Sequence, residues 1–347
     1  MPQTEDESMA PRRVLITGTA GFIGFHLAQL LLDEGFRVHG YDGMTDYYDV
    51  NLKRRRHQML LQNAKFSATE GMLEDDARLW SVAEGFQPTV IVHLAAQAGV
   101  RDSLENLRAY IDSNIVGTFN VMEAARQLGV QHLLMASTSS VYGANEDMPF
   151  IETEKADTQL TIYAATKKAT ESMGHSYAHL WNLPVTMFRF FTVYGPWGRP
   201  DMALYKFVEA ILAERPIDIY NHGDMHRDFT FVTDLVRGIR LLIDTPPVRP
   251  EFKGQIQPGD SLSHVASYRV VNIGNSDKVR LLDFIEAIEA ELGKQAIRNY
   301  MPMQAGDVPA TWADANLLQK LTGYRPETNF KEGIAQFVAW FREYYQK

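Results

Sequence analysis

The chain has no cysteine among its 347 residues. Thiolate catalysis, disulfide bonds and cysteine-based zinc sites are therefore excluded. No apolar run approaches the ~20 residues that a membrane-spanning helix needs, so no membrane association is expected. The first ten residues, MPQTEDESMA, lack the cationic start and apolar centre of a secretory signal, and we expect a disordered tail over residues 1–11. Together these absences favour a cytoplasmic protein.

Positive charge is also scarce, because 34 Lys and Arg residues face 43 Asp and Glu residues, for a net charge of −9. Proteins that bind nucleic acids usually present a basic face, so no nucleic-acid partner is expected. The one dense basic run, residues 53–57 (KRRRH), is interpreted as a solvated helix face. His222 and His226 lack a suitable third ligand nearby, so no metal site is predicted.

Short apolar segments alternate with helical patterns through the first half of the chain. Such alternation is typical of a parallel sheet with helices on both faces. The continuous apolar run at residues 90–96 predicts a strand that is buried on both sides. The expected strands are 13–17, 37–41, 65–69, 89–95, 132–138 and 184–191, and the expected helices are 22–35, 48–62, 74–84, 105–128 and 161–181.

After residue 191 the pattern loosens, and residues 247–268 predict an irregular loop. The predicted fold class is α/β, with a Rossmann-type doubly wound parallel sheet and a smaller mixed α/β C-terminal substrate lobe. The predicted nucleotide-binding domain covers residues 12–191, to which 229–245 and 268–274 return, and the predicted lobe covers 192–228 and 275–347.

The first expected strand runs into residues 18–24 (GTAGFIG) and then into a helix. Glycines at this junction permit a tight turn, a close approach of backbone N–H groups to a pyrophosphate, and close packing of the helix on the sheet. The G-x-x-G-x-x-G spacing in this context predicts a dinucleotide site, with a plain glycine turn as the alternative. Asp42 follows the second strand, where a carboxylate would take the adenosine ribose hydroxyls and repel a 2′-phosphate. We therefore expect NAD rather than NADP, unless Asp42 only caps a turn.

Tyr163 and Lys167 lie four residues apart in a helical stretch and therefore share a face. Thr138 ends a buried strand, and sites of parallel sheets form at the carboxyl ends of strands. Oxidation of an alcohol needs a base, and a nearby ammonium should lower the pKa of a phenol toward that role. We therefore predict that Tyr163, Lys167 and Thr138 are catalytic. An accidental pair on a helix surface is the alternative.

These motifs resemble the extended short-chain dehydrogenase/reductase family, over almost the whole chain from about residue 12 to 345. The segments that carry the resemblance are residues 17–24, 93–96 (HLAA), 138–143 (TSSVYG), 163–167 (YAATK) and 194–196 (YGP). The resemblance implies a Rossmann domain, bound NAD, a nucleotide-sugar lobe and a homodimer packed through the helices near 105–128 and 161–181. It implies a cofactor site of Gly18, Gly21, Phe22, Ile23, Gly24, Asp42, Leu73, Leu94, Ala95, Ala96, Tyr163 and Lys167.

Within the family, residues 190–203 (FFTVYGPWGRPDMA) look like those of the UDP-glucuronate 4-epimerases. Most sugar epimerases of the family carry Asn where this chain has Thr192. Residues 304–309 (QAGDVP) also fit this group, since related galactose epimerases have Arg where Gln304 stands. The implied activity is an NAD-dependent 4-epimerisation of a UDP-sugar, from UDP-glucuronate to UDP-galacturonate, through a transient 4-keto intermediate.

The same resemblance implies the roles of the substrate residues. Thr192 and Arg199 would hold the sugar carboxylate, although Arg199 could instead only stabilise a loop by its charge. Met72 departs from the pattern, because related enzymes often have an adenine-contacting Asp there. The implied substrate site comprises Thr138, Thr192, Arg199, Lys206, Arg227, Gln304 and Asp307, of which Arg227 and Asp307 would contact the phosphates and ribose.

The residues after Thr138 separate an epimerase from related enzymes. Family dehydratases typically place Asp-Glu there, and UDP-xylose-forming decarboxylases resemble Thr-Ser-Glu. This chain has Ser139 and Ser140 instead, so no carboxylate is placed for a second proton transfer. A UDP-glucose or UDP-N-acetylhexosamine 4-epimerase, a UDP-glucuronate decarboxylase, a net dehydrogenase and a non-catalytic NAD-binding protein stay open as alternatives.

Overall fold

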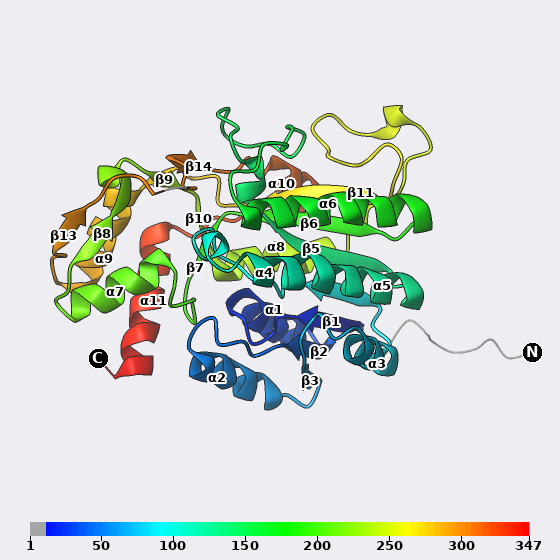
Figure 1. The fold of residues 1–347 in the computed structure, drawn as a ribbon, viewed down its shortest axis with the longest axis horizontal. Coiled ribbons are helices and arrows are strands. Elements are labelled where there is room, and N and C mark those ends of the chain that lie inside the picture. Colours follow the sequence, from blue (N-terminus) through cyan, green and yellow to red (C-terminus); the bar gives the residue numbers. More distant parts are fainter. Residues whose placement is uncertain (1–11, 305, 347) are drawn as a thin grey trace, which may run out of the picture.

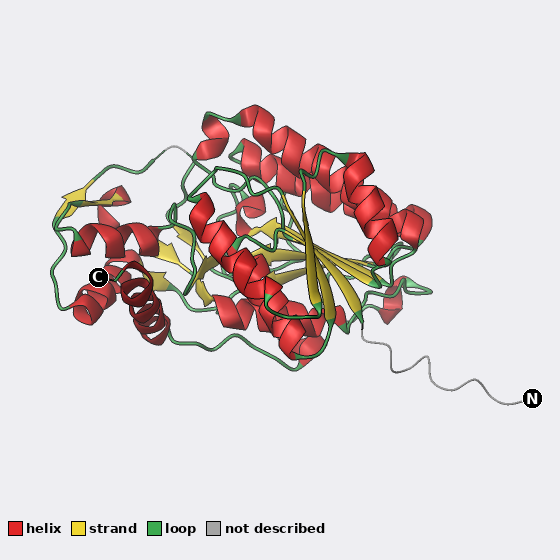
Figure 2. Ribbon diagram, turned by 90° about the horizontal axis from the view of Figure 1, so that it is seen from below, coloured by secondary structure: helices red, strands yellow, loops and turns green. Residues whose placement is uncertain are grey.

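A seven-stranded parallel sheet forms the centre of the computed structural model, which describes residues 12–304 and 306–346 (Figures 1 and 2). The tail predicted at residues 1–11 lies outside the described residues. The strand order is β11-β6-β5-β4-β1-β2-β3, and it confirms the predicted α/β class. The strands are β1 (Arg13–Thr17), β2 (Arg37–Asp42), β3 (Phe66–Glu70), β4 (Val90–His93), β5 (His132–Thr138), β6 (Val185–Phe190) and β11 (Tyr268–Ile273). The order reverses between β1 and β4, which opens a crevice at their carboxyl ends.

Helices cover both faces of this sheet, as the alternating pattern predicts. On one face α1 packs against α2 and α8, and α10 packs against α8 and β11. On the other face α5 packs between α3 and α6. The helices are α1 (Phe22–Asp33), α2 (Val50–Leu61), α8 (Val232–Ile243), α10 (Asn316–Thr322), α3 (Asp76–Phe86), α5 (Thr118–Leu128) and α6 (Ile162–Trp181).

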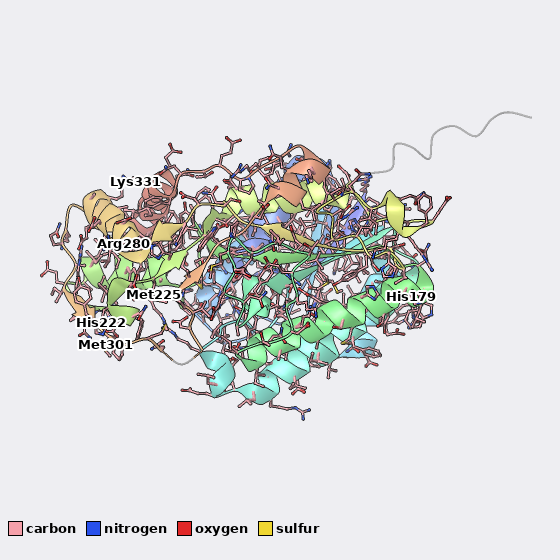
Figure 3. The ribbon with its side chains drawn as sticks, turned by 90° about the horizontal axis from the view of Figure 1, so that it is seen from above. His179, His222, Met225, Arg280, Met301 and Lys331 are labelled. Atoms are coloured by element: carbon pink, nitrogen blue, oxygen red, sulfur yellow. The ribbon has the colours of Figure 1, made fainter. Side chains whose placement is uncertain are left out.

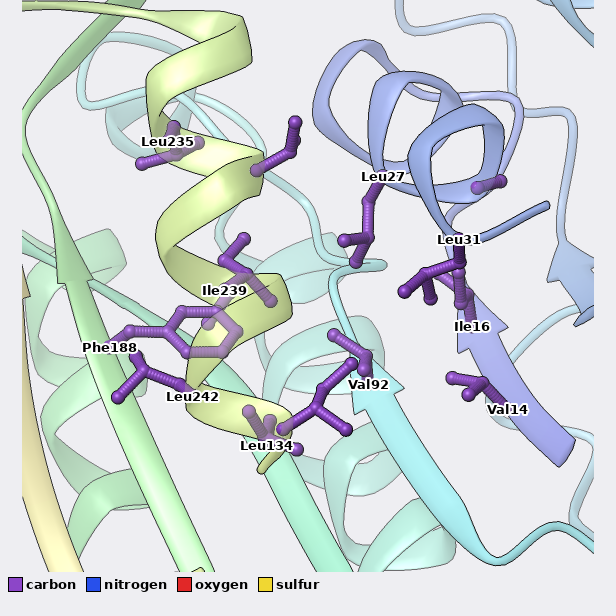
Figure 4. Close-up of a cluster of buried hydrophobic side chains, with 14 of the residues drawn as sticks. Val14, Ile16, Leu27, Leu31, Val92, Leu134, Phe188, Leu235, Ile239 and Leu242 are labelled. Carbon is purple, nitrogen blue, oxygen red and sulfur yellow. The ribbon is translucent and has the colours of Figure 1, made fainter. Parts of the chain in front are cut away.

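The strands alternate their side chains between two apolar layers. Val14 and Ile16 of β1 belong to the core under α1 and α8, whereas Leu15 belongs to the core under α3, α5 and α6. Helices α1 and α8 meet the first core with apolar residues at a spacing of three or four, which places them on one face of each helix (Figure 4). The residues of this core that Figure 4 labels are Val14, Ile16, Leu27, Leu31, Val92, Leu134, Phe188, Leu235, Ile239 and Leu242.

A smaller lobe lies at one end of the sheet, where Figure 1 shows α7, α9 and α11 beside short strands. Phe229 stacks on Phe284 with ring centroids 3.8 Å apart, which joins β10 to α9 in a separate apolar core. Figure 3 shows His222 and Met301 in this lobe and His179 at the opposite end of the molecule. The lobe contains β7 (Thr192–Tyr194), α7 (Ala203–Leu212), β8 (Ile217–Ile219), β9 (His226–Arg227), β10 (Phe229–Phe231), β12 (Val279–Arg280), α9 (Leu281–Leu292), β13 (Arg298–Tyr300), β14 (Ala310–Thr311) and α11 (Phe330–Tyr345).

Most expected elements are confirmed to within two residues, but two expectations fail. The helix expected at 105–128 is divided into α4 (Leu107–Tyr110), a π-helical stretch (Ile111–Gly117) and α5. The buried side chain of Asn114 bonds both the backbone of Gln97 and the hydroxyl of Thr166 from this wider turn. The basic run is not a solvated face, because Lys53 and Arg56 are buried, whereas Arg54 and Arg55 are exposed.

Two further features bear on the predicted domains and on membranes. Helix α10 lies in the range predicted for the lobe, yet Leu317 and Leu318 pack in the core of the large sheet. Residues 247–268 form an irregular loop with one 3-10 turn (Lys253–Gln255), as expected. None of the described helices has the length and apolar character needed to cross a membrane.

Candidate active site

One large cleft of about 1600 Å³ lies between the carboxyl edge of the sheet and the lobe. Its lining joins the loops after β1, β4 and β5 to the start of α6 and to the lobe. Gln304 is the one predicted site residue outside the lining; it lies in a turn where its carbonyl accepts a bond from the N–H of Asp307 (3.2 Å). The predicted residues that line the cleft are Gly18, Gly21, Phe22, Ile23, Gly24, Asp42, Leu73, Leu94, Ala95, Ala96, Thr138, Tyr163, Lys167, Thr192, Arg199, Lys206, Arg227 and Asp307.

The glycine loop leaves no room for side chains at two of its positions. Gly18 has φ +85°, and a Cβ there would lie 2.8 Å from the N of Ala95. A Cβ on Gly24 would lie 2.0 Å from the carbonyl oxygen of Gly18. The loop is therefore a tight turn that directs the N-terminus of α1, which begins after Gly21, toward the cleft. This arrangement suits an anionic pyrophosphate.

Asp42 lies beside this turn at the end of β2. Its carboxylate accepts bonds from the backbone N–H groups of Ala20 and Met44, both at 2.9 Å, and the residue lines the cleft. Each carboxylate oxygen keeps a lone pair that could accept a hydroxyl. The cradle and this acceptor together fit a dinucleotide whose ribose hydroxyls are free.

The first turn of α6 carries Tyr163, and Lys167 follows one turn later. The hydroxyl of Thr161 caps the helix by accepting a bond from the N–H of Ala164 (3.2 Å). The ammonium of Lys167 is buried and donates to the carbonyl of Ala136 (3.0 Å), and burial lowers its pKa to about 8. Sheet and helix thus fix both reactive side chains at the bottom of the cleft.

Burial has the largest influence on the pKa of the Tyr163 phenol. Burial raises its pKa, and the opposing influences are a hydrogen bond with Thr138 and the positive charge of Arg199. The ammonium of Lys167, one helical turn from Tyr163, donates its hydrogen bond to the carbonyl of Ala136. The expectation that the lysine lowers the pKa of the phenol when the cofactor is bound stays a prediction.

Hydroxyl groups surround the reacting end of the cleft. Thr138 accepts a bond from the N–H of Ser140 (3.2 Å) and donates to the Ser140 hydroxyl (3.3 Å). Among the described residues, no carboxylate hydrogen-bonds Thr138 or Tyr163. The hydroxyls of Thr138 and Tyr163 therefore have no carboxylate in hydrogen-bonding contact that could act as their acid–base partner.

His93 is a structural residue at the end of β4. Its two ring nitrogens interact with the hydroxyls of Thr17 (2.7 Å) and Thr118 (2.9 Å). Burial lowers the pKa of His93 to about 3, so the ring is neutral. His93 therefore packs near the site, and both of its ring nitrogens already have hydroxyl partners.

Charged side chains define the lobe side of the cleft. Arg199 forms a two-point ion pair with Asp201, from Nε to Oδ1 (3.0 Å) and from Nη2 to Oδ2 (2.6 Å). Asp307 lies 3.7 Å from Arg227 and 3.5 Å from Arg101. The sequence interpretation missed Asp201 and Arg101. Asp201 falls within the motif of residues 190–203, but its pairing with Arg199 depends on the fold of that loop.

Comparisons with known proteins agree with this geometry. A family model described as GDP-mannose 4,6 dehydratase matches residues 15–337. A probable UDP-glucuronate 4-epimerase of Rhizobium meliloti (strain 1021) is 55% identical over 335 residues, which cover 96% of this chain and 98% of the relative. UDP-glucuronate 4-epimerase 4 of Arabidopsis thaliana is 41% identical, over 96% of this chain and 76% of the relative.

A solved structure is similar along the same length. The UDP-glucuronic acid 4-epimerase from Bacillus cereus, in complex with UDP-glucuronic acid and NAD, superposes with a TM-score of 0.85 at 30% identity, covering 96% of this chain and 100% of that one. The family model, these relatives, the seven-stranded sheet and the glycine loop agree with one another. The chain belongs to the extended short-chain dehydrogenase/reductase family.

Proposed function

We propose that this protein is an NAD-dependent epimerase that converts UDP-glucuronate to UDP-galacturonate by inverting C4 of the sugar. The observation that carries the proposal is one cleft that joins the glycine loop, the hydroxyls of Thr138 and Tyr163 and the cationic side chain of Arg199. The names of the relatives, UDP-glucuronate 4-epimerases at 55% and 41% identity, support the same substrate.

The glycine loop and Asp42 are proposed to hold NAD. The loop N–H groups would face the pyrophosphate, and the Asp42 carboxylate would accept the ribose hydroxyls. NAD held there would supply the acceptor for the hydride of C4 and the donor that returns this hydride to the sugar. Since epimerisation leaves the cofactor unchanged, the protein should need no added NAD.

Tyr163 is proposed to take the proton of the C4 hydroxyl and to return it after the ring has turned. Thr138, which hydrogen-bonds the phenol, would hold the same sugar oxygen. The positive charge of Arg199 favours the phenolate, against the effect of burial. Proton transfer of this kind contributes on the order of 10²–10⁴-fold to rate.

Arg199 and Thr192 are proposed to hold the sugar carboxylate. The 4-keto form of glucuronate is a β-keto acid, which loses CO₂ when its carboxylate is free to rotate and lose its charge. A guanidinium that pairs with the carboxylate maintains both its charge and its orientation. Arg227 and Asp307 would anchor the diphosphate end, about whose bonds the ring turns between the two hydride transfers.

Turnover of UDP-glucuronate without added NAD tests this function. We expect NMR to show UDP-galacturonate and no change at the nicotinamide absorbance band. UDP-xylose as the main product would indicate a decarboxylase, and a 4-keto-6-deoxy sugar would indicate a dehydratase. Conversion of UDP-glucose but not UDP-glucuronate would overturn the acid-sugar assignment.

The proposal includes a homodimer formed through α4, α5 and α6, in the cytoplasm, which the lack of cysteine favours. Several large apolar side chains are exposed on these helices and on the π-helical stretch between α4 and α5, at 40–64% of their area for the residues named next. Their clustering suits an interface between two copies. They are Leu107, Ile111, Val116, Phe119, Leu180 and Trp181. A monomer in sedimentation at micromolar concentration would contradict this part of the proposal.

A further inference from the structure

The basic run on α2 contains a cation that the catalytic proposal does not use. Arg56 is 0% exposed and is among the largest fully buried side chains of the described residues, whereas Arg54 and Arg55 beside it are exposed. Burial of a guanidinium is costly unless hydrogen bonds replace its water. The hydrogen bonds of Arg56 must therefore compensate for the water that its guanidinium loses on burial.

Arg56 directs its donors at the backbone of two loops. Its Nη1 donates to the carbonyl of Ala20 (2.9 Å) and to the hydroxyl of Tyr48 (2.8 Å). Its Nη2 donates to the carbonyls of Trp197 (2.5 Å) and Gly198 (3.4 Å). No ion pair joins Arg56 to a carboxylate within residues 12–304 and 306–346. The guanidinium is therefore a bridge between backbone segments and not a member of a salt bridge.

The two bridged loops belong to the two sides of the cleft. Ala20 lies inside the glycine loop, and Trp197 and Gly198 directly precede Arg199. The guanidinium of Arg56 thus connects the glycine loop to the loop that carries Arg199, the residue proposed to hold the sugar carboxylate. Five N–H donors in a rigid fork can satisfy several carbonyls at once, which the single ammonium of a lysine cannot reproduce.

The loop before Arg199 needs such support. Trp197 has φ +60°, a left-handed conformation that costs a bulky residue free energy and persists only when its surroundings impose it. Its ring packs against Phe25 of α1 (5.7 Å between centroids) and Trp340 of α11 (5.3 Å). His26, whose pKa burial lowers to about 4, is neutral and donates to the carbonyl of Pro196 (2.9 Å).

We infer that Arg56 is a positioning residue that fixes the loop of Arg199 to the glycine loop and thereby sets the preference for a sugar with a carboxylate. The inference rests on the proposed function, because it assigns Arg199 to the sugar carboxylate. Without Arg56, two carbonyls of the loop lose their partners, and the loop that carries Arg199 and Asp201 is no longer fixed to the glycine loop. The diphosphate site around Arg227 lies apart from this bridge and should be unaffected.

The test compares two ligands that differ by the sugar. Dissociation constants of UDP-glucuronate and of UDP are measured by calorimetry on the cofactor-loaded protein, in a Tyr163→Phe background that prevents turnover. We expect Arg56→Gln to weaken UDP-glucuronate about tenfold, the scale of one charge-assisted hydrogen bond, and to leave UDP unchanged. With Tyr163 intact, the same variant should release a larger share of decarboxylated product. Arg55→Gln, an exposed neighbour on the same helix, serves as the matched control and should match the parent in every measurement.

Each outcome decides the inference. Equal weakening of both ligands, or of neither, overturns it, since a merely structural role would not single out the sugar. Should Arg56→Gln fail to fold, Arg56→Lys keeps the cation without the fork and is judged by the same ratio. Loss of folding in both variants would make Arg56 a structural residue and would also overturn the inference. Failure of the parent protein to epimerise UDP-glucuronate would instead refute the proposed function, independently of the ratio.

Discussion

The cofactor cradle on the sheet side of the cleft is made mainly by backbone, whereas the lobe side of the cleft is defined by charged side chains. Gly18 and Gly24 press backbone against backbone, so the cofactor cradle follows from a glycine spacing that is visible in the sequence. Arg199 forms an ion pair with Asp201 of the same loop. Arg227, on the two-residue strand β9, lies near Asp307. The glycine loop is defined by one short segment of the sequence. The lobe side of the cleft depends on contacts between distant segments, such as those of Arg227 and Asp307.

The largest effect is expected where the two sides meet, at Tyr163. Tyr163→Phe removes the only proton-transfer group of the proposed mechanism and should lower the turnover rate by about 10²–10⁴-fold. The dissociation constant for UDP-glucuronate should change little, since the ring remains. Tyr177→Phe, near the other end of α6, should turn over at the parent rate. NMR of the product measures the turnover rate. Turnover of Tyr163→Phe at the parent rate would refute the proposed role of Tyr163 in proton transfer.

On the sheet side, we expect a substitution that displaces the backbone of the glycine loop to reduce stability and cofactor binding. Gly24→Ala adds a Cβ 2.0 Å from the carbonyl oxygen of Gly18, and the loop must shift to admit it. We expect a loss of about 2–3 kcal/mol in the free energy of unfolding and a protein purified with less bound NAD. Gly85→Ala is the control, because a Cβ there meets nothing within 4 Å. Full cofactor content in Gly24→Ala would show that the cradle tolerates a side chain.

On the lobe side, we expect the loss of a charged side chain to weaken substrate binding while the fold stays intact. Arg199→Met removes the guanidinium while retaining much of the apolar stem, and we expect about tenfold weaker binding of UDP-glucuronate with unchanged binding of UDP. Some decarboxylated product should also be released. Arg280→Met, an exposed lobe residue, is the control. Unchanged affinity and a pure product would show that Arg199 only stabilises its loop.

The same contrast explains what the sequence predicts. The strand–helix order, the glycine loop and the pair Tyr163–Lys167 rest on local spacing, and the structure has the expected elements at these positions. The burial of Arg56 was missed, although its spacing of four from Leu52 and from Leu60 places it on the buried face of α2. Its hydrogen-bond partners on the glycine loop and on the 197–198 loop depend on the fold.

Two other features needed the folded chain. The π-helical turn at Asn114 depends on contacts with Gln97 and Thr166, which lie on other segments. The pKa of Tyr163 is raised because burial outweighs the charges near it, and neither burial nor the direction of the Lys167 ammonium is encoded in a four-residue spacing.

The smallest expected effect concerns the junction between the sheet and the lobe, where Glu152 is buried. Its carboxylate accepts a bond from the N–H of Asn272 on β11 (2.8 Å), and nearby Phe150 pairs with Ala313. Burial raises the pKa of Glu152 from 4.5 to about 7. Between these pH values the folded state binds more protons than the unfolded state, so the free energy of unfolding falls as pH rises through this window and is constant above it with respect to this group.

Glu152→Gln removes this titration and can still accept the bond from Asn272. We expect the variant to be more stable than the parent by about 1 kcal/mol at pH 8, less than the full pKa shift implies because the buried amide must also lose water, and to lose the advantage at pH 4.5. Denaturant unfolding at both pH values measures the difference, and exposed Asp147→Asn provides the control. A difference that is the same at both pH values would mean that folding leaves the pKa of Glu152 unshifted, and that the junction tolerates a buried charge as the lobe side of the cleft does.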